Sequence, residues 1–170
     1  MSDTAKLTFD DNTYELPVIV GTEDEHAFDI SKLRAQTGLI TLDTGFKNTG
    51  STKSKITFLD GEKGILRYRG YAIEDLAEQS TFLEVAYLLI HGEVPTQGQF
   101  NSFREEIATH TLIHEDLRRF YEAYPSKAHP MGILASMVSA MSTFYPNSHD
   151  PNRPAEKVNL TIVRLLAKLP

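Results

Sequence analysis

The chain has 170 residues, of which 41% are hydrophobic and 24% are charged, as in ordinary globular domains. Its 17 Lys and Arg against 23 Asp and Glu give a net charge of -6, which argues against a broad nucleic-acid-binding surface. The sequence contains no cysteine, which excludes disulfides, thiolate metal sites and cysteine nucleophiles.

The sequence carries no segment typical of export or of a membrane span. The N-terminal stretch MSDTAKLTFDDNTYEL lacks the apolar run of a secretory signal. The longest apolar run, Val85 to Ile90, is far shorter than the roughly 18 residues that a spanning helix needs. We therefore expect a cytoplasmic protein with neither a membrane nor a nucleic acid as partner.

The first part of the chain predicts short β-strands separated by turns. Lys6 to Phe9 and Tyr14 to Val20 flank an Asp-Asp-Asn turn, which is the pattern of a β-hairpin. Ser31 is placed to cap a short helix that Gly38 would end. Leu39 to Leu42 predicts a further strand.

The stretch FLDGEKGILRYRGY (58–71) allows two interpretations. A phosphate-binding loop would need glycines that lead into a helix N-terminus with Lys and Ser or Thr, and no such sequence follows. A hairpin fits better, because a turn at Asp60-Gly61 separates two runs of alternating character. Arg67 and Arg69 then share one face of the return strand and become candidate ion-pair or interface residues. With this hairpin, we predict a β-rich region over residues 1–70.

From residue 71 to residue 170 the apolar residues recur at helical spacing. A capping box at Thr96 and Gln99 and a stop signal at Gly92 support two of the predicted helix ends. The helix from Met131 to Tyr145 has one bulky face and one face of small residues, so we expect it to be buried on two sides. The other predicted helices are Ile73–Glu78, Thr81–Gly92 (with Ser80 or Thr81 as its cap), Thr96 to about Thr111, His114–Ala123 and Val158–Leu169.

Two kinds of catalytic centre are disfavoured by the motifs. His110 and His114 are four residues apart, a spacing that joins two metal ligands on one helix. However, the order H-x-x-x-H-E differs from the H-E-x-x-H of zinc peptidases, and no third ligand group is evident, so we predict no metal site. No G-x-S-x-G sequence marks a nucleophilic serine.

The last predicted helix carries a polar stripe made by Lys157, Thr161, Arg164 and Lys168. Like charges at Arg164 and Lys168 repel by roughly a few tenths of a kcal/mol, which an anion held between them would offset. Alternatively, the two cations interact favourably with the dipole at the helix C-terminus. The pattern alone leaves both interpretations open.

Longer stretches resemble a known family. The segments KITFLDGEKGILRYRGYAIEDLAEQSTFLEVAYLLIHGEVPT, THTLIHEDLRRF, SKAHPMGILASMVSAMSTFYP and RLLAKLP are similar, in this order, to bacterial citrate synthases of the larger, hexameric type (type II). The resemblance extends over nearly the whole chain, from DISKLRAQTGLITLDTGF onward. Since chains of this family continue for more than as many residues again, we expect this sequence to be an N-terminal portion.

The resemblance implies a mainly α, multihelical fold: a partial large domain over residues 71–170, preceded by the small β-rich region over residues 1–70. It implies the condensation of acetyl-CoA with oxaloacetate to citrate and CoA, without a metal or a redox cofactor, by a homo-oligomer (dimer or hexamer). The family's catalytic residues, two histidines and an aspartate, lie in its C-terminal half. We therefore expect no catalytic residue in this chain.

The resemblance also implies a regulatory site. Members of this type in many bacteria bind NADH as an allosteric inhibitor in their N-terminal half. Where NADH-sensitive relatives can carry a basic residue and a methionine, this chain has Thr109 and Leu112. The positions that match the NADH site are His110, Thr111, Tyr145, Arg164 and Lys168.

Two alternatives to citrate synthase remain at this point. One is 2-methylcitrate synthase, which uses propionyl-CoA on the same fold. The other is a stand-alone helical module of 170 residues that binds a nucleotide or serves assembly.

Overall fold

The computed structural model of the protein describes residues 3–170. The chain divides into two compact units, an N-terminal unit that ends at Ser54 and a C-terminal unit that begins at Lys55. The predicted division after residue 70 follows the change from strands to helices, which occurs at Ile73. The division by compactness lies earlier, because the second hairpin packs with the helices that follow it.

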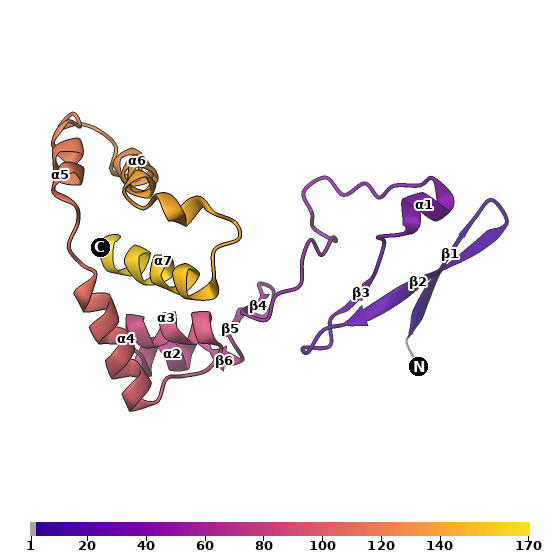
Figure 1. Cartoon of the computed structure of the whole chain (residues 1–170). Helices are drawn as coiled ribbons and strands as arrows, with labels where there is room; N and C mark the ends of the chain where they lie inside the picture. The colour runs from indigo at the N-terminus through magenta and orange to yellow at the C-terminus, as the bar shows by residue number, and fades with distance from the viewer. Residues whose placement is uncertain (1–2) are drawn as a thin grey trace. The chain divides into compact units, whose positions relative to one another are not determined.

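The N-terminal unit contains a three-stranded antiparallel sheet (Figure 1). Phe9 pairs with Asn12 across a two-residue turn, Asp10 and Asp11, whose φ angles are 47° and 61°. Two successive left-handed residues are the geometry of a type I′ turn, which Asp tolerates. The predicted first hairpin is therefore confirmed. The strands, in sheet order, are β1 (Thr4–Phe9), β2 (Asn12–Val20) and β3 (His26–Phe28).

Helix α1 (Leu33–Thr37) ends as predicted but begins differently. Gly38 adopts the left-handed conformation (φ 74°) that ends the helix. Ser31 does not cap α1, because the N-cap position belongs to Lys32, which makes no side-chain cap. Instead, the backbone N–H of Ser31 donates to the Asp29 carboxylate at 2.8 Å, and this bond holds the pKa of Asp29 below its usual value.

The predicted strand Leu39–Leu42 is wrong, since residues 39–42 form no regular secondary structure. Ile40 and Leu42 are 74% and 88% exposed, so their apolar side chains mark no core face in this unit. The chain turns instead at Asp43, whose carboxylate accepts hydrogen bonds from the backbone of Asn48 (2.9 Å) and the hydroxyl of Thr49 (2.8 Å). A side chain that bonds the local backbone favours a turn over an extended strand.

The second predicted hairpin is confirmed in the C-terminal unit. The Asp60 carboxylate accepts bonds from the backbone N–H groups of Glu62 and Lys63, and Gly64 supplies the left-handed residue of the turn. A third strand of two residues was not predicted. The antiparallel strands are β4 (Thr57–Asp60), β5 (Ile65–Tyr68) and β6 (Tyr71–Ala72).

All the predicted helices form, and most of their bounds differ from the prediction by one to three residues. The last turn of the helix predicted to reach Tyr145 becomes a separate 3₁₀-helix. None of the helices among residues 3–170 is long and apolar enough to cross a membrane. The helices are α2 (Ile73–Gln79), α3 (Phe82–His91), α4 (Gln97–Thr109), α5 (Glu115–Glu122), α6 (Pro130–Met141), η1 (Ser142–Phe144), η2 (Pro146–His149) and α7 (Ala155–Lys168).

Side-chain caps fix the starts of α3 and α4. Thr81 and Glu84 form one capping box, and Thr96 and Gln99 form the predicted second one. Because the Glu84 carboxylate accepts bonds from the hydroxyl and the backbone N–H of Thr81, its pKa is lowered. Gly92 ends α3 with a φ of 93°.

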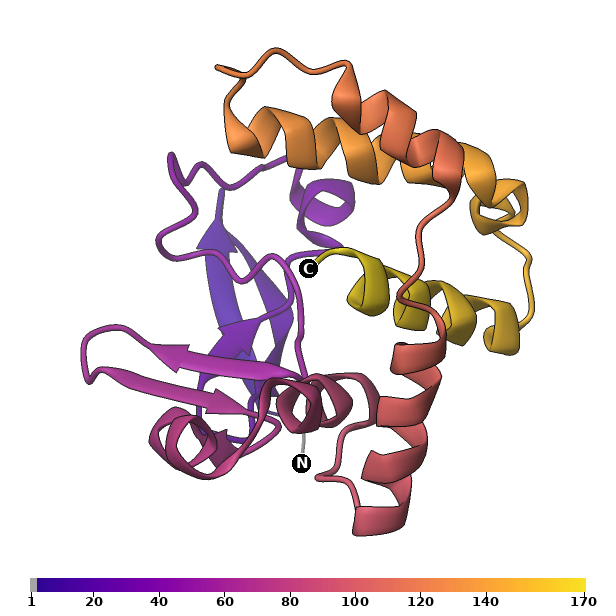
Figure 2. The ribbon, with the colours of Figure 1, turned by 90° about the vertical axis from the view of Figure 1, so that its left-hand side faces the viewer.

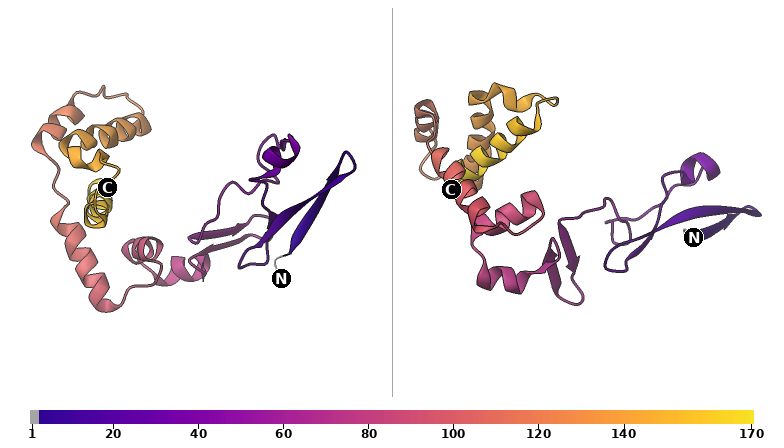
Figure 3. Two further views of the ribbon diagram at one scale, coloured as in Figure 1. Left: turned by 45° about the vertical axis from the view of Figure 1, so that its right-hand side comes forward. Right: turned by 60° about the horizontal axis from the view of Figure 1, so that its bottom comes forward.

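The core of the C-terminal unit lies where α3, α4 and α7 meet (Figure 3). Its buried members are Ala86, Phe103, Ile107 and Val163, and the rings of Tyr87 and Phe103 meet edge to face at 5.5 Å. Helix α3 is only partly buried. Phe82, at its start, is 70% exposed.

Helix α6 packs along α5 (Figure 2) and against η1. Its small residues Gly132, Ala135 and Ser136 are exposed, and Met131 is 62% exposed. Within the C-terminal unit, therefore, α6 is covered on one side and not on the two sides that the sequence pattern predicted.

Arg69, a candidate for an ion pair or an interface, donates its hydrogen bonds to backbone carbonyl groups. Its guanidinium donates to the carbonyl of Leu89 (2.8 Å), in the last turn of α3, and to that of Lys55 (3.3 Å). The last carbonyls of a helix lack partners within the helix, so Arg69 supplies one and ties the hairpin to α3.

We expect Gly92→Ala to destabilise the protein by about 1–2 kcal/mol, because an L-residue is strained at a φ of 93°. Gly98→Ala is the matched control. Gly98 lies in the first turn of α4 with open space around its Cα, so alanine there should stabilise the protein by about 0.5–1 kcal/mol. Chemical denaturation of the two variants measures both changes in the free energy of unfolding. Changes of the same sign would contradict the left-handed conformation assigned to Gly92.

Candidate functional site

The five residues that the resemblance assigns to a nucleotide site all lie in the C-terminal unit. His110 and Thr111 follow α4, Tyr145 lies between η1 and η2, and Arg164 and Lys168 lie one turn apart on α7. The structure brings two pairs of them together: Tyr145 with Arg164, and Lys168 with His110.

Tyr145 and Arg164 form a cation–π pair, in which the guanidinium carbon lies 4.5 Å from the centroid of the ring. The ring is placed by a break in the helical path. Tyr145 leaves helical geometry (φ −130°, ψ 65°) after η1, and Pro146 begins η2 immediately afterwards. Because η2 contacts α7, this turn directs the Tyr145 ring against that helix.

A cavity of about 240 Å³ opens beside the cation–π pair. One wall is residues 144–148, and the other is the α7 face that carries Lys157, Leu160, Thr161 and Arg164. Two of the lining residues are cationic and none is acidic. The cavity is smaller than the roughly 300–1,000 Å³ typical of drug-sized ligands, so it suits one charged group of a ligand better than a whole dinucleotide.

Lys168 points to a different place. Its ammonium donates to the carbonyl oxygens of His110 (2.5 Å) and Leu112, and it does not line the cavity. The carbonyl of His110, the C-cap of α4, is one of the acceptors that lack a partner within the helix, and the carbonyl of Leu112 lies in the loop that follows. Lys168 therefore joins the end of α7 to the end of α4.

The side chains of His110 and Thr111 bond to the end of their own helix. The Nδ1 atom of His110 is 2.8 Å from the carbonyl oxygen of Glu106, and the Thr111 hydroxyl donates to the carbonyl of Ala108 at 3.0 Å. Both groups lie beside the contact made by Lys168, and neither lines the cavity.

His110 and His114 are not paired ligands on one helix. His110 is the C-cap of α4, whereas His114 is the N-cap of α5, where its Nδ1 accepts a bond from the backbone N–H of Asp116 (3.2 Å). The ring of His114 packs against that of Phe144 at 4.9 Å. Among residues 3–170, no group of three or more His, Cys, Asp or Glu could hold a metal ion.

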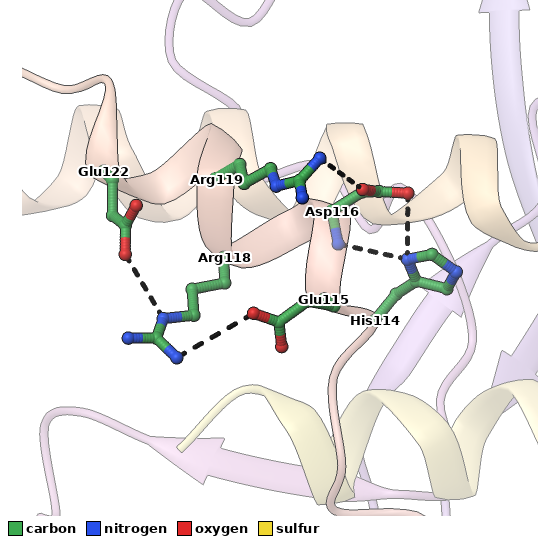
Figure 4. Close-up of polar contacts among 6 residues, drawn as sticks. All are labelled: His114, Glu115, Asp116, Arg118, Arg119 and Glu122. Carbon is green, nitrogen blue, oxygen red and sulfur yellow. Dashed lines mark hydrogen bonds and ion pairs between the residues drawn. The ribbon is translucent and has the colours of Figure 1, made fainter.

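The arginines of α5 are already paired with carboxylates (Figure 4). Arg118 lies 3.8 Å from Glu115 and 3.2 Å from Glu122, and Arg119 lies 3.5 Å from Asp116. These exposed pairs at i,i+3 and i,i+4 spacing add a few tenths of a kcal/mol each, roughly, to the helix. They mark a solvated surface and not a binding site.

The sequence pattern identified the cations of α7. It did not predict the cavity, which Lys157 and Arg164 line and Lys168 does not. One wall of the cavity is made by residues 144–148, and the sequence pattern does not place these residues against α7. The spacing of Lys157, Thr161 and Arg164 (i, i+4, i+7) was the one available signal that these three share a face.

The chain is thus a mainly helical protein with a β-rich N-terminal region and a cavity that is lined by two cationic residues and no acidic one. A family model described as "Citrate synthase, C-terminal domain" matches residues 45–170. The chain belongs to the citrate synthase family.

Curated relatives match almost the whole chain. It is 48% identical over 168 residues to citrate synthase 1 of Mycobacterium tuberculosis. The match covers 99% of this chain and 39% of that protein. It is 46% identical over 169 residues to the citrate synthase of Corynebacterium glutamicum, covering 99% of this chain and 38% of the relative. The chain therefore spans less than half the length of these relatives.

Solved structures share the fold. The citrate synthase of Thermotoga maritima matches 75% of this chain and 32% of its own with a TM-score of 0.62 and 26% identity. That of Pyrobaculum aerophilum matches 73% and 33% with a TM-score of 0.61 and 30% identity. The Thermoplasma acidophilum enzyme, solved with carboxymethyl coenzyme A and oxaloacetate, supports the fold alone (73% and 32% of the two chains, TM-score 0.64, 22% identity).

We expect Tyr145 and Arg164 to stabilise each other by about 0.5–2 kcal/mol, because the guanidinium lies over the ring and both side chains are half-buried. A double-mutant cycle with Tyr145→Leu and Arg164→Met, followed by chemical denaturation, measures this coupling. Tyr145→Phe keeps the ring face and should keep the coupling. A coupling that vanishes with Phe would attribute it to the hydroxyl instead.

Proposed function

We propose that this chain is the N-terminal portion of a citrate synthase of the larger bacterial type. The whole protein then condenses acetyl-CoA with oxaloacetate and water to citrate and CoA, the entry step of the tricarboxylic acid cycle. The observation that carries the proposal is the match of residues 45–170 to the family, together with 48% identity to a curated citrate synthase over 168 residues.

In this proposal the chain supplies scaffold and regulation, and the reacting groups lie elsewhere in the protein. Enolising a thioester methyl group requires an acid and a base preorganised around the developing enolate. The histidines of α4, α5 and α6 are engaged in helix ends: His110 follows α4, and His114 and His129 accept bonds from the first N–H groups of α5 and α6. The proposed enzyme acts in the cytoplasm as a homo-oligomer and uses no metal or redox cofactor.

Turnover by the whole protein tests this assignment. Oxaloacetate-dependent release of CoA should be faster with acetyl-CoA than with propionyl-CoA. Because no histidine of this chain is assigned to the chemistry, His110→Ala and His129→Ala should keep kcat within about threefold, far less than the roughly 10²–10⁴-fold loss expected for a missing acid or base.

A preference for propionyl-CoA would identify the protein as a 2-methylcitrate synthase instead. A loss of kcat of more than a hundredfold in either histidine variant, with an unchanged thermal midpoint, would mean that this chain does contribute to the reacting centre.

We also propose that NADH inhibits the whole protein at the site formed around His110, Thr111, Tyr145, Arg164 and Lys168. Support comes from the half-buried Arg164, which faces a cavity without acidic residues and stacks on an aromatic ring. Thr109 and Leu112 stand where NADH-sensitive relatives can carry a basic residue and a methionine, which favours weak binding.

Arg164→Ala should raise the NADH concentration for half-inhibition about ten- to a hundredfold, since a hydrogen bond to a charged group contributes about 1.5–3 kcal/mol. Arg118→Ala removes the same charge from the exposed face of α5 and serves as the matched control. Kinetic titration of the whole enzyme compares the two. The proposal fails if NADH inhibits neither the wild type nor the control.

A further inference from the structure

We propose that Lys157 and Arg164 are the two cations that hold an oxyanion in the cavity between residues 144–148 and α7. Lys168, the other cation of the stripe, holds the end of α4 in place. This inference rests on the proposed nucleotide site and assigns the group within it that binds phosphate.

The cavity face of α7 is defined by helical spacing. Lys157, Thr161 and Arg164 lie at positions i, i+4 and i+7 and all line the cavity. The Thr161 hydroxyl donates to the carbonyl oxygen of Lys157 at 2.9 Å, so its proton is already in use. The side-chain N–H groups available to an anion on this face are therefore those of Lys157 and Arg164.

Both cations lack an acidic partner within the described part of the chain. No ion pair or side-chain hydrogen bond joins Lys157 or Arg164 to another residue among 3–170, although Arg118 of α5 pairs with two carboxylates and Arg119 with one. The acidic residue next to Lys157, Glu156, lines a separate hollow together with Glu106. The cavity beside Tyr145 is therefore positive.

Lys157 is exposed, but the half-buried position of Arg164 is costly without a ligand. A half-buried guanidinium loses hydration, and the face of Tyr145 replaces only part of it. An oxyanion would receive charge-assisted hydrogen bonds from both side chains, of the kind that Arg and Lys form with phosphate.

Lys168 is occupied elsewhere. Its ammonium already donates to the carbonyls of His110 and Leu112, and rotation toward the cavity would leave both acceptors at the end of α4 without this partner. The like-charged i,i+4 pair at Arg164 and Lys168 thus makes two different contacts, since Arg164 lines the cavity and Lys168 binds the end of α4.

The volume limits the ligand class. About 240 Å³ admits a phosphate or pyrophosphate group with its hydration. The ligand is therefore either the phosphate portion of a nucleotide, whose remainder lies outside the cavity, or a free phosphate.

The test is a binding titration of the whole protein with two probes, NADH and inorganic pyrophosphate. Lys157→Gln should weaken the binding of each probe about tenfold, as the loss of one charge-assisted hydrogen bond predicts. Lys157→Arg keeps the charge and should restore binding to within about threefold of the wild type. Lys127→Gln removes the same charge from an exposed position away from the cavity and should have no effect.

Amide hydrogen exchange distinguishes the role of Lys168 from that of Lys157. In Lys168→Gln the amide protons of residues 110–113 should exchange faster with solvent, while in Lys157→Gln their exchange should stay unchanged. The thermal midpoint of each variant verifies that it is folded.

The outcomes distinguish this inference from the proposed function. If NADH binds and Lys157→Gln binds both probes as tightly as Lys127→Gln does, the nucleotide site stands and the assignment of Lys157 is wrong. If pyrophosphate alone binds, and Lys157→Gln weakens it, the cavity takes a free phosphate and the NADH proposal fails. If the wild type binds neither probe, both are overturned.

Discussion

The arrangement of the C-terminal unit depends on the packing of α7 against α3 and α4. Val163, which is 4% exposed, reaches Ala86, Phe103 and Ile107 across a large separation in sequence. Burial of such side chains contributes about 1.5–3 kcal/mol each and fixes the rotation of α7 about its axis. With Val163 facing the core, Arg164 faces Tyr145, and Lys168 faces the end of α4. The positions of the candidate site therefore follow from an apolar contact that contains none of its residues.

Cations in this protein repeatedly serve the backbone acceptors where helical segments end. Arg69 donates to a carbonyl in the last turn of α3, Lys168 donates to two carbonyls after α4, and Arg153 donates to the carbonyls of Ser148 and Asp150 around the end of η2. A helix leaves its last carbonyls without internal partners, and a long cationic side chain from elsewhere in the fold can satisfy them. This use competes with ligand binding, so the number of cations near a site overstates the number available to an anion.

Much of the local structure could be predicted from the sequence, because it depends on neighbouring residues. The Asp10-Asp11 turn, the stop at Gly92 and the capping box of Thr96 all involve residues within four positions of one another. The failures have a different cause. Leu39–Leu42 has the composition of a strand but pairs with none. Arg69 was predicted to lie in an ion pair or an interface, because its partner, the Leu89 carbonyl, has no signature in the sequence.

The candidate site was predictable only in part, for the same reason. The residues matched by resemblance do lie close to one another. Some of them line the cavity and Lys168 instead binds the end of α4, and this difference depends on which way each side chain of α7 points. Lys157 and Lys168 look alike in the sequence stripe. Their different surroundings arise from residues 144–148 and from the end of α4, which the helical period does not place.

The segment that contains α5 and α6 leaves and rejoins the rest of the C-terminal unit at one turn of α7. Lys168 holds the carbonyl of Leu112, where the segment begins, and Arg164 holds the ring of Tyr145, where it ends. The contact between His114 and Phe144 closes the same two ends upon each other. Both ends of the segment are thus attached to a single turn of α7, which runs from Arg164 to Lys168. A substitution that shifts this turn therefore affects both attachments of α5 and α6 together.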